Sequence, residues 1–275
     1  MPVSVIHGED LLEQTLRVHF PGHDLHSAPA QPLLEKVGVW LPREAYYEWP
    51  IMLPWALRDL GCRGNKRDKP DIWSSPGRTG HFLDDNTMIK GLIRPLTVRS
   101  PGGPAHGKRL RGGFVAAHIW RIVHHADLAS RIPGLYSFIP NIVWLPKEVA
   151  KRTDYEGGIY QRTLQAMSAA IYRNAPVKPA LDEVVNASWE MLPGSALSVA
   201  QLRPAELNWF EVGPSFHALR RTRLNEVLAA LRSIEKGKPL MKKVIATRYT
   251  IGLPLVPPAV RATLLADLTR FESGT

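Results

Sequence analysis

The chain has 275 residues, of which 44% are hydrophobic, 8% aromatic and 22% charged. This is ordinary globular usage and argues against a disordered chain. Lys and Arg number 35 against 25 Asp and Glu, which gives a net charge of +10. Such an excess favours a polyanionic partner such as nucleic acid, because each neutralised phosphate releases a counterion. The alternative is a chain that is basic only for solubility.

A single cysteine, Cys62, excludes an internal disulfide and a thiolate-rich zinc site. No apolar run approaches the roughly 18 residues that span a bilayer. The first residues, MPVSVIHGEDLLEQ, lack the basic start and apolar stretch of a secretion signal. We therefore expect a cytoplasmic protein with no membrane partner.

The N-terminal part begins with a predicted helix over Gly8 to Arg17. From His19 to Gly107 the chain is punctuated by Pro and Gly, and short strands and loops packed by aromatic residues are expected there. Its tryptophans have three possible roles, which are core packing, base stacking and holding a modified base, and core packing is the commonest outcome. These tryptophans are Trp40, Trp49, Trp55 and Trp73.

A basic stretch, residues 100–113, follows and is expected to be a mobile loop or a hairpin tip, with Lys108, Arg109 and Arg111 available to nucleic acid. Phe114 to Trp120 and Phe138 to Pro146 are apolar runs typical of buried strands. Pro146 precedes a predicted helix, KEVAKRTDYE, which Gly157 and Gly158 interrupt. The local order is therefore strand, loop, strand, helix.

The C-terminal part is the most basic, with 11 Lys and Arg against 4 Asp and Glu from Ser215 onward. A helix is expected to start after Ser215 as N-cap and to end at Gly237. Arg220, Arg221 and Arg223 lie near its start, where the helix dipole disfavours cations. Phosphate contact would explain them, and a solvated helix face is the alternative.

The central strand–loop–strand–helix segment carries AAHI (Ala116 to Ile119), NIVWLP (Asn141 to Pro146) and VAKRTD (Val149 to Asp154). His118 and Asn141 are 23 residues apart, and Asp154 follows 13 residues later. With these motifs the chain resembles the HNH (His-Me finger, ββα-metal) nucleases, in which a ββα hairpin holds one divalent metal ion against a scissile phosphate. The resemblance covers about 45 of the 275 residues.

The resemblance implies a role for each matched residue. His118 would be the general base, and its ordinary pKa suits deprotonation of water. Asn141 would fix the loop or orient the imidazole, and Asp154 would bind Mg²⁺ or Mn²⁺. Basic residues on the same elements would hold the backbone, namely Arg121, Lys147, Lys151 and Arg152.

Two positions depart from the family pattern. Ala150 stands where the family usually has a His or Asn ligand, and Ala117 stands where many members have an acidic one. A further metal ligand would then be needed. Asp84 and Asp85 are candidates, with a surface turn or helix cap as the alternative. His124 and His125 are weaker candidates, with solvated loop histidines as the alternative. For His118 itself the alternative is a core histidine bonded to backbone.

These observations predict an α+β protein with an HNH-like ββα-metal core over residues 83–190. An irregular, aromatic-rich N-terminal region (1–82) and a basic helical C-terminal region (191–275) would flank it. The expected function is that of a metal-dependent DNA endonuclease in restriction or defence, and a homodimer would suit duplex cleavage. The alternatives are a non-catalytic nucleic-acid-binding protein on a degenerate nuclease scaffold and an unrelated basic enzyme.

Overall fold

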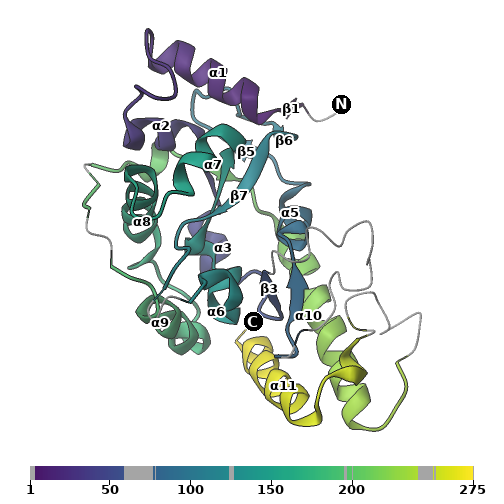
Figure 1. Cartoon of the computed structure of the whole chain (residues 1–275). Helices are drawn as coiled ribbons and strands as arrows, with labels where there is room; N and C mark the ends of the chain where they lie inside the picture. The colour runs from purple at the N-terminus through teal and green to yellow at the C-terminus, as the bar shows by residue number, and fades with distance from the viewer. Residues whose placement is uncertain are drawn as a thin grey trace.

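The computed structural model describes residues 4–58, 77, 79–123, 127–194, 197–199, 201–240, 250 and 252–274. Cys62, Trp73, His124 and His125 lie outside the described residues. The chain is a mixed α+β protein, as the sequence predicts (Figure 1). None of the helices in the described ranges combines the length and the apolar character that crossing a membrane requires.

The described residues form short strands and helices of very different length. The strands are β1 (Val5–Ile6), β2 (Val39–Trp40), β3 (Ala56–Arg58), β4 (Phe82–Asp84), β5 (Val98–Arg99), β6 (Arg109–Leu110), β7 (Phe114–His118), β8 (Ile142–Pro146) and β9 (Asn208–Phe210). The helices are α1 (Gly8–His19), α2 (Ala30–Val37), α3 (Arg43–Glu48), α5 (Thr87–Ile93), α6 (Pro133–Tyr136), α7 (Lys147–Thr153), α8 (Ile159–Tyr172), α9 (Asp182–Glu190), α10 (Pro214–Glu235) and α11 (Pro258–Ser273).

A five-stranded sheet with the order β5-β9-β2-β8-β7 organises the molecule. β8 runs antiparallel to both β2 and β7, whereas β2 and β9 are parallel. All five residues of β8 are buried, as expected for an apolar strand covered on both faces. The three sequence regions 1–82, 83–190 and 191–275 each contribute at least one strand, so they share one sheet.

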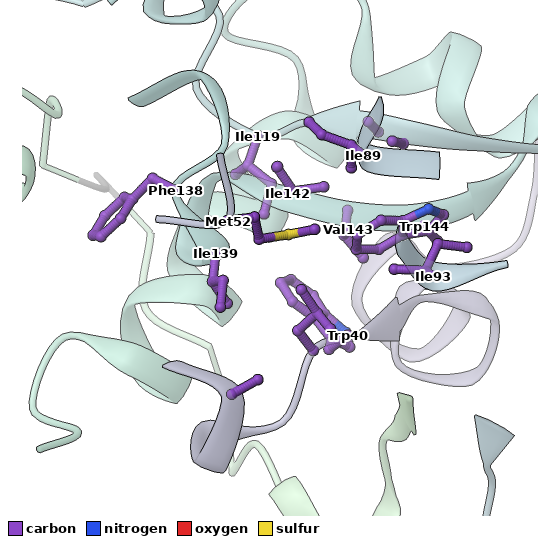
Figure 2. Close-up of a cluster of buried hydrophobic side chains, with 14 of the residues drawn as sticks. Trp40, Met52, Ile89, Ile93, Ile119, Phe138, Ile139, Ile142, Val143 and Trp144 are labelled. Atoms are coloured by element: carbon purple, nitrogen blue, oxygen red, sulfur yellow. The ribbon is translucent and has the colours of Figure 1, made fainter. Parts of the chain in front are cut away.

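The largest side chains of the core gather around β2 and β8. Figure 2 shows Trp40, Val143 and Trp144 in one apolar cluster with Met52 and Ile139. The described tryptophans of the N-terminal region, which are Trp40, Trp49 and Trp55, are each at most 2% exposed. Of their three expected roles, core packing is therefore the one that the structure shows.

One expectation for the chain before β7 needs correction. Residues 19–107 contain α2, α3 and α5 in addition to short strands. Pro32 lies in the first turn of α2, where proline is tolerated, and Gly91 lies within α5.

Of the two alternatives for the basic stretch 100–113, the structure shows the hairpin tip. Thr97 and Arg109 form an antiparallel bridge, the Val98 N–H donates to the Lys108 carbonyl at 2.9 Å, and the Gly107 N–H donates to the Val98 carbonyl at 2.8 Å. Arg109–Leu110 form β6, which also pairs in parallel with β1.

The C-terminal region is helical as predicted, and α10 packs against α11 (Figure 1). α10 begins at Pro214 with Gly213 as its N-cap, so the predicted Ser215 cap is wrong by two residues. Arg220 is fully buried and donates to the Trp49 and Ile51 carbonyls at 2.6 and 3.2 Å. Arg220 therefore has neither of the roles expected from the sequence, which were phosphate contact and a place on a solvated helix face. Its hydrogen bonds connect α10 to the core instead.

Candidate functional site

The matched motifs fold into an antiparallel hairpin followed by a helix. β7 and β8 pair from Phe114↔Pro146 to His118↔Ile142, and α7 begins directly after β8 and packs on β7. The Lys147 N–H donates to the Gly113 carbonyl at 2.7 Å, which fixes the start of α7 beside the start of β7. The two predicted strands and the helix after the second strand are therefore confirmed, whereas the connection predicted as a loop contains the short helix α6.

His118 is the last residue of β7 and is 7% exposed. Its Nε2 lies 3.0 Å from the Tyr136 carbonyl oxygen, and because a carbonyl only accepts, Nε2 carries the hydrogen. Nδ1 then carries a lone pair; it is shielded from solvent and has no hydrogen-bond partner among the described residues. Burial, with a smaller effect from the nearby Arg58 cation, lowers the pKa of His118 to about 3, so the ring is neutral at pH 7.

Tyr136 links His118 to a buried carboxylate. The Tyr136 ring stacks on the imidazole with centroids 5.8 Å apart, and its hydroxyl donates to Asp84 Oδ2 at 2.7 Å. The Met88 N–H donates to the same oxygen at 3.0 Å. Burial raises the pKa of Asp84, although these hydrogen bonds favour the carboxylate. Asp84 ends β4 and lies opposite Arg58 in the β3–β4 register.

Asn141 is fully buried in the turn that precedes β8. Its Oδ1 accepts the Trp120 N–H at 2.7 Å, and its Nδ2 donates to the Leu135 carbonyl at 3.0 Å. The first bond joins the two ends of the β7–β8 connection, and the second holds Asn141 against the later part of that connection. Of the two roles expected for Asn141, these bonds match fixing the loop, since the imidazole is not among its bonded partners.

A cavity of about 560 Å³ opens beside β7 and α7. We call it the His118 cavity. Five of its lining residues are cations and a single one is a carboxylate, so it favours an anion. The lining residues are Arg58, Asn86, Lys90, Val115, Ala116, Ala117, His118, Arg121, Lys147, Ala150, Lys151, Thr153 and Asp154.

The structure brings part of the predicted set together. Arg121, Lys147, Lys151 and Asp154 join His118 at this cavity. The Asp154 side chain is 74% exposed and lies 4.0 Å from Arg121 Nη1. Arg121 Nη1 also donates to the Asp154 carbonyl.

Other predicted residues lie elsewhere. Asp84 and Asp85 do not line the His118 cavity, and Asp84 is held by Tyr136 instead. Arg152 reaches His26, with Nη2 2.6 Å from the ring Nδ1. Arg109 and Arg111 line a separate cavity, and Lys108 lines neither of the two.

Sequence reasoning did not single out Arg58, Asn86 or Lys90, which also line the His118 cavity. Arg58 comes from β3, and the other two flank or belong to α5. Asn86 has a left-handed backbone (φ 58°) and its Nδ2 donates to the Ala116 carbonyl at 3.3 Å. Asn immediately before a short helix is a weak local signal of this conformation, whereas nothing local marks Arg58 or Lys90.

The described residues do not fit the Mg²⁺ or Mn²⁺ site that the HNH resemblance implies. No group of three or more His, Cys, Asp or Glu side chains gathers anywhere in the described part of the chain. At the His118 cavity a hard cation would meet one carboxylate, Asp154, and several positive side chains. Ala117 and Ala150 both line this cavity, so the two positions at which the family pattern has further ligands present only methyl groups.

Comparisons of the chain with models of protein families, with curated proteins and with solved structures find no match.

Proposed function

We propose that the His118 cavity binds a phosphodiester of DNA and that His118 acts as the general base in its hydrolysis. The observation that carries the proposal is the neutral imidazole with a lone pair on Nδ1, at a cavity lined by five cations. A general base has to be unprotonated near neutral pH, and an anionic substrate requires compensating positive charge. The neutral ring and the five cations supply both, although Nδ1 is shielded from solvent in the free protein.

The charges of the cavity support phosphate binding. Lys147 lies on the first turn of α7, and Lys151 lies one turn later on the same helix. Both are exposed and line the cavity together with Arg121. Lys151 also pairs with Glu148 at 2.8 Å, an exposed contact of small energetic value that a phosphate replaces at low cost.

The proposed reaction involves three proton transfers. Nδ1 of His118 takes a proton from a water molecule, whose oxygen forms a bond to phosphorus. The bond from phosphorus to the leaving oxygen breaks, and that oxygen leaves with the electron pair and takes a proton from solvent. The surrounding cations stabilise the negative charge that grows on the phosphate oxygens. Imidazolium then returns its proton to water.

Substrate binding also adjusts the base itself. Burial lowers the pKa of His118 to about 3, which makes the free ring a weak base. A phosphodiester in the cavity brings a negative charge close to the ring, and an opposite charge raises the pKa of an imidazole. The substrate therefore strengthens the base that acts on it.

Cleavage of supercoiled plasmid and of a labelled DNA duplex tests the proposal, with parallel reactions in Mg²⁺, in Mn²⁺ and in chelator. Wild type is expected to cleave in at least one condition, and His118→Ala is expected to lose cleavage while it keeps DNA binding. His23→Ala is the matched control, because His23 is exposed and distant in sequence from the site. Equal cleavage by wild type and His118→Ala would overturn the proposal.

The second candidate function is that of a nucleic-acid-binding protein without catalysis on a degenerate nuclease scaffold. The presence of Ala117 and Ala150 in the cavity lining favours this candidate. The burial of His118 and its hydrogen bond to a backbone carbonyl favour it too, because both are features of a core histidine. Tight, salt-dependent DNA binding without cleavage in any of the three conditions would establish this candidate. Salt-insensitive or absent binding would favour an unrelated enzyme.

A further inference from the structure

We infer that a second cavity, lined by residues of α5, of β6 and of the start of β7, binds a further phosphate of the same DNA strand that enters the His118 cavity. We call it the Arg109 cavity. Its volume is about 580 Å³. The inference rests on the proposed nucleic-acid substrate and extends it, because it requires a polynucleotide and not an isolated phosphodiester. Its lining residues are Lys90, Gly91, Ile93, Arg94, Pro95, Arg109, Leu110, Arg111, Gly112, Phe114 and Trp144.

The charge of the Arg109 cavity is entirely positive among its described lining residues. Arg94 and Arg111 are exposed, and Arg109 is half-buried. None of these three arginines takes part in an ion pair between described residues. Arg109 Nε is shielded from solvent and has no hydrogen-bond partner among the described residues. A buried donor without an acceptor costs free energy, and a phosphate oxygen would satisfy it.

The two cavities adjoin along the same elements. Lys90 of α5 lines both. On β7, Phe114 lines the Arg109 cavity, and the next four residues, 115–118, line the His118 cavity. Figure 1 shows α5 next to β7. The cations therefore form one continuous basic track from Arg111 and Arg109, past Lys90, to Lys147 and Lys151.

The length of this track matches several nucleotides. A strand rises about 3.3 Å per residue, so the four steps from Phe114 to His118 cover roughly 13 Å. Phosphates of one DNA strand rise ~3.4 Å per nucleotide along the duplex axis and also wind round it, so successive phosphates are further apart than this rise. A strand with one phosphate beside His118 thus places a phosphate a few nucleotides away at the Arg109 cavity. A dinucleotide is too short to occupy both.

Binding of two probes to the full chain tests the inference. The probes are a short labelled DNA duplex and the dinucleotide dTpdT, which has a single phosphodiester. In the variant Arg94→Ala/Arg109→Ala, we expect duplex affinity to fall about tenfold at low salt. The slope of the logarithm of the binding constant against the logarithm of the salt concentration should become shallower by about two. The reason is that each lost phosphate contact reduces this slope by roughly one. Binding of dTpdT should stay at the wild-type value.

The control variant is Arg270→Ala, at an exposed arginine on α11 that lines neither cavity. It removes one positive charge, as Arg94→Ala alone does, at a different place. It should leave the salt slope of duplex binding unchanged. Because Arg109 is half-buried, Arg94→Ala alone is measured as well, and it should lower the slope by about one. Thermal unfolding of each variant shows whether it is folded.

Two outcomes would overturn the inference. An unchanged duplex affinity and salt slope in the folded double variant would show that the Arg109 cavity does not contact the strand. An equal loss of duplex and dTpdT binding would show that the substitutions disturb the His118 cavity instead. Failure of the proposed hydrolysis is recognised separately, because a wild type that binds but never cleaves leaves these binding results intact.

Discussion

Tyr136 holds the imidazole of His118 with two different groups: its backbone carbonyl accepts the Nε2 hydrogen at 3.0 Å, and its ring stacks on the imidazole at 5.8 Å. The first contact sets the tautomer, and the second limits the orientation of the ring. Because the Tyr136 hydroxyl is in turn bonded to Asp84, strand β4 supports the end of strand β7 through one side chain.

Tyr136→Phe tests this support. The substitution keeps the carbonyl and the ring but removes the hydroxyl that donates to Asp84, a buried carboxylate. We expect the free energy of unfolding to fall by about 1–3 kcal/mol, the usual result when a buried polar group loses a partner. Urea unfolding gives the value. Tyr155→Phe, at an exposed tyrosine, should change it little, and an unchanged stability in Tyr136→Phe would contradict the structural role of the bond.

The pH dependence of stability tests the burial of His118. Its folded pKa of about 3 lies below the value near 6.5 in an unfolded chain. Above pH 6.5 the ring is neutral in both states and contributes nothing. Between about pH 6.5 and pH 3 the unfolded chain binds a proton that the folded chain does not. Stability therefore decreases as pH falls, by up to about 1.4 kcal/mol per pH unit from this one group.

The measurement is urea unfolding of wild type and His118→Gln at several pH values from neutral to mildly acidic. The stability difference, wild type minus variant, should become less favourable to wild type as the pH falls. A difference that stays constant over this range would mean that His118 titrates normally in the folded chain. Phosphate added to the buffer should reduce the effect if an anion in the cavity raises the pKa of the ring.

Asn141→Ala should destabilise the chain strongly. Two buried backbone groups, the Trp120 N–H and the Leu135 carbonyl, lose their partner at once. At about 1–3 kcal/mol for each unsatisfied group, we expect a loss of roughly 2–6 kcal/mol. Asn186→Ala, on the exposed face of α9, is the control and should stay within about 0.5 kcal/mol of wild type. A small loss in Asn141→Ala would mean that the loop does not depend on this side chain.

Arg220 and Arg221 are neighbours with opposite environments, so they form a matched pair. Arg220→Ala removes the donor to two backbone carbonyls and leaves a cavity in the core, for which we expect a loss of about 3 kcal/mol or more. Arg221→Ala, at an exposed position, should stay close to wild type in thermal unfolding. A similar effect of both substitutions would contradict the burial of Arg220.

Ala117→Asp/Ala150→His is a gain-of-function test of the ββα arrangement. Both positions line the His118 cavity together with Asp154, so the double variant would offer two carboxylates and an imidazole to a divalent ion. We expect Mn²⁺ to bind the variant more tightly than wild type and to raise its Tm, as measured by calorimetry and thermal unfolding. Equal Mn²⁺ affinity of wild type and the folded variant would show that these side chains do not converge.

Local sequence determined the elements of the central segment. The apolar runs of β7 and β8, with Pro146 before α7 and Gly157 and Gly158 after it, specify strand, strand and helix through near-neighbour preferences alone. Before β7 the same local signals gave α1 correctly but failed for the helices that follow it. There, α2, α3 and α5 are only six to eight residues long, too short for a clear helical period in the sequence.

By itself, then, the sequence determined the positive charge, the order of elements around His118 and the position of Asn141 before β8. Only the tertiary structure decided which charges meet. In the folded chain, Arg58 and Lys90 lie at the His118 cavity, and Asp84 binds Tyr136 instead. Arg152 contacts His26, and Arg220 is buried. The physical reason is that charge pairing and burial depend on residues far apart in the chain, which sheet pairing and core packing bring together and which no local pattern encodes.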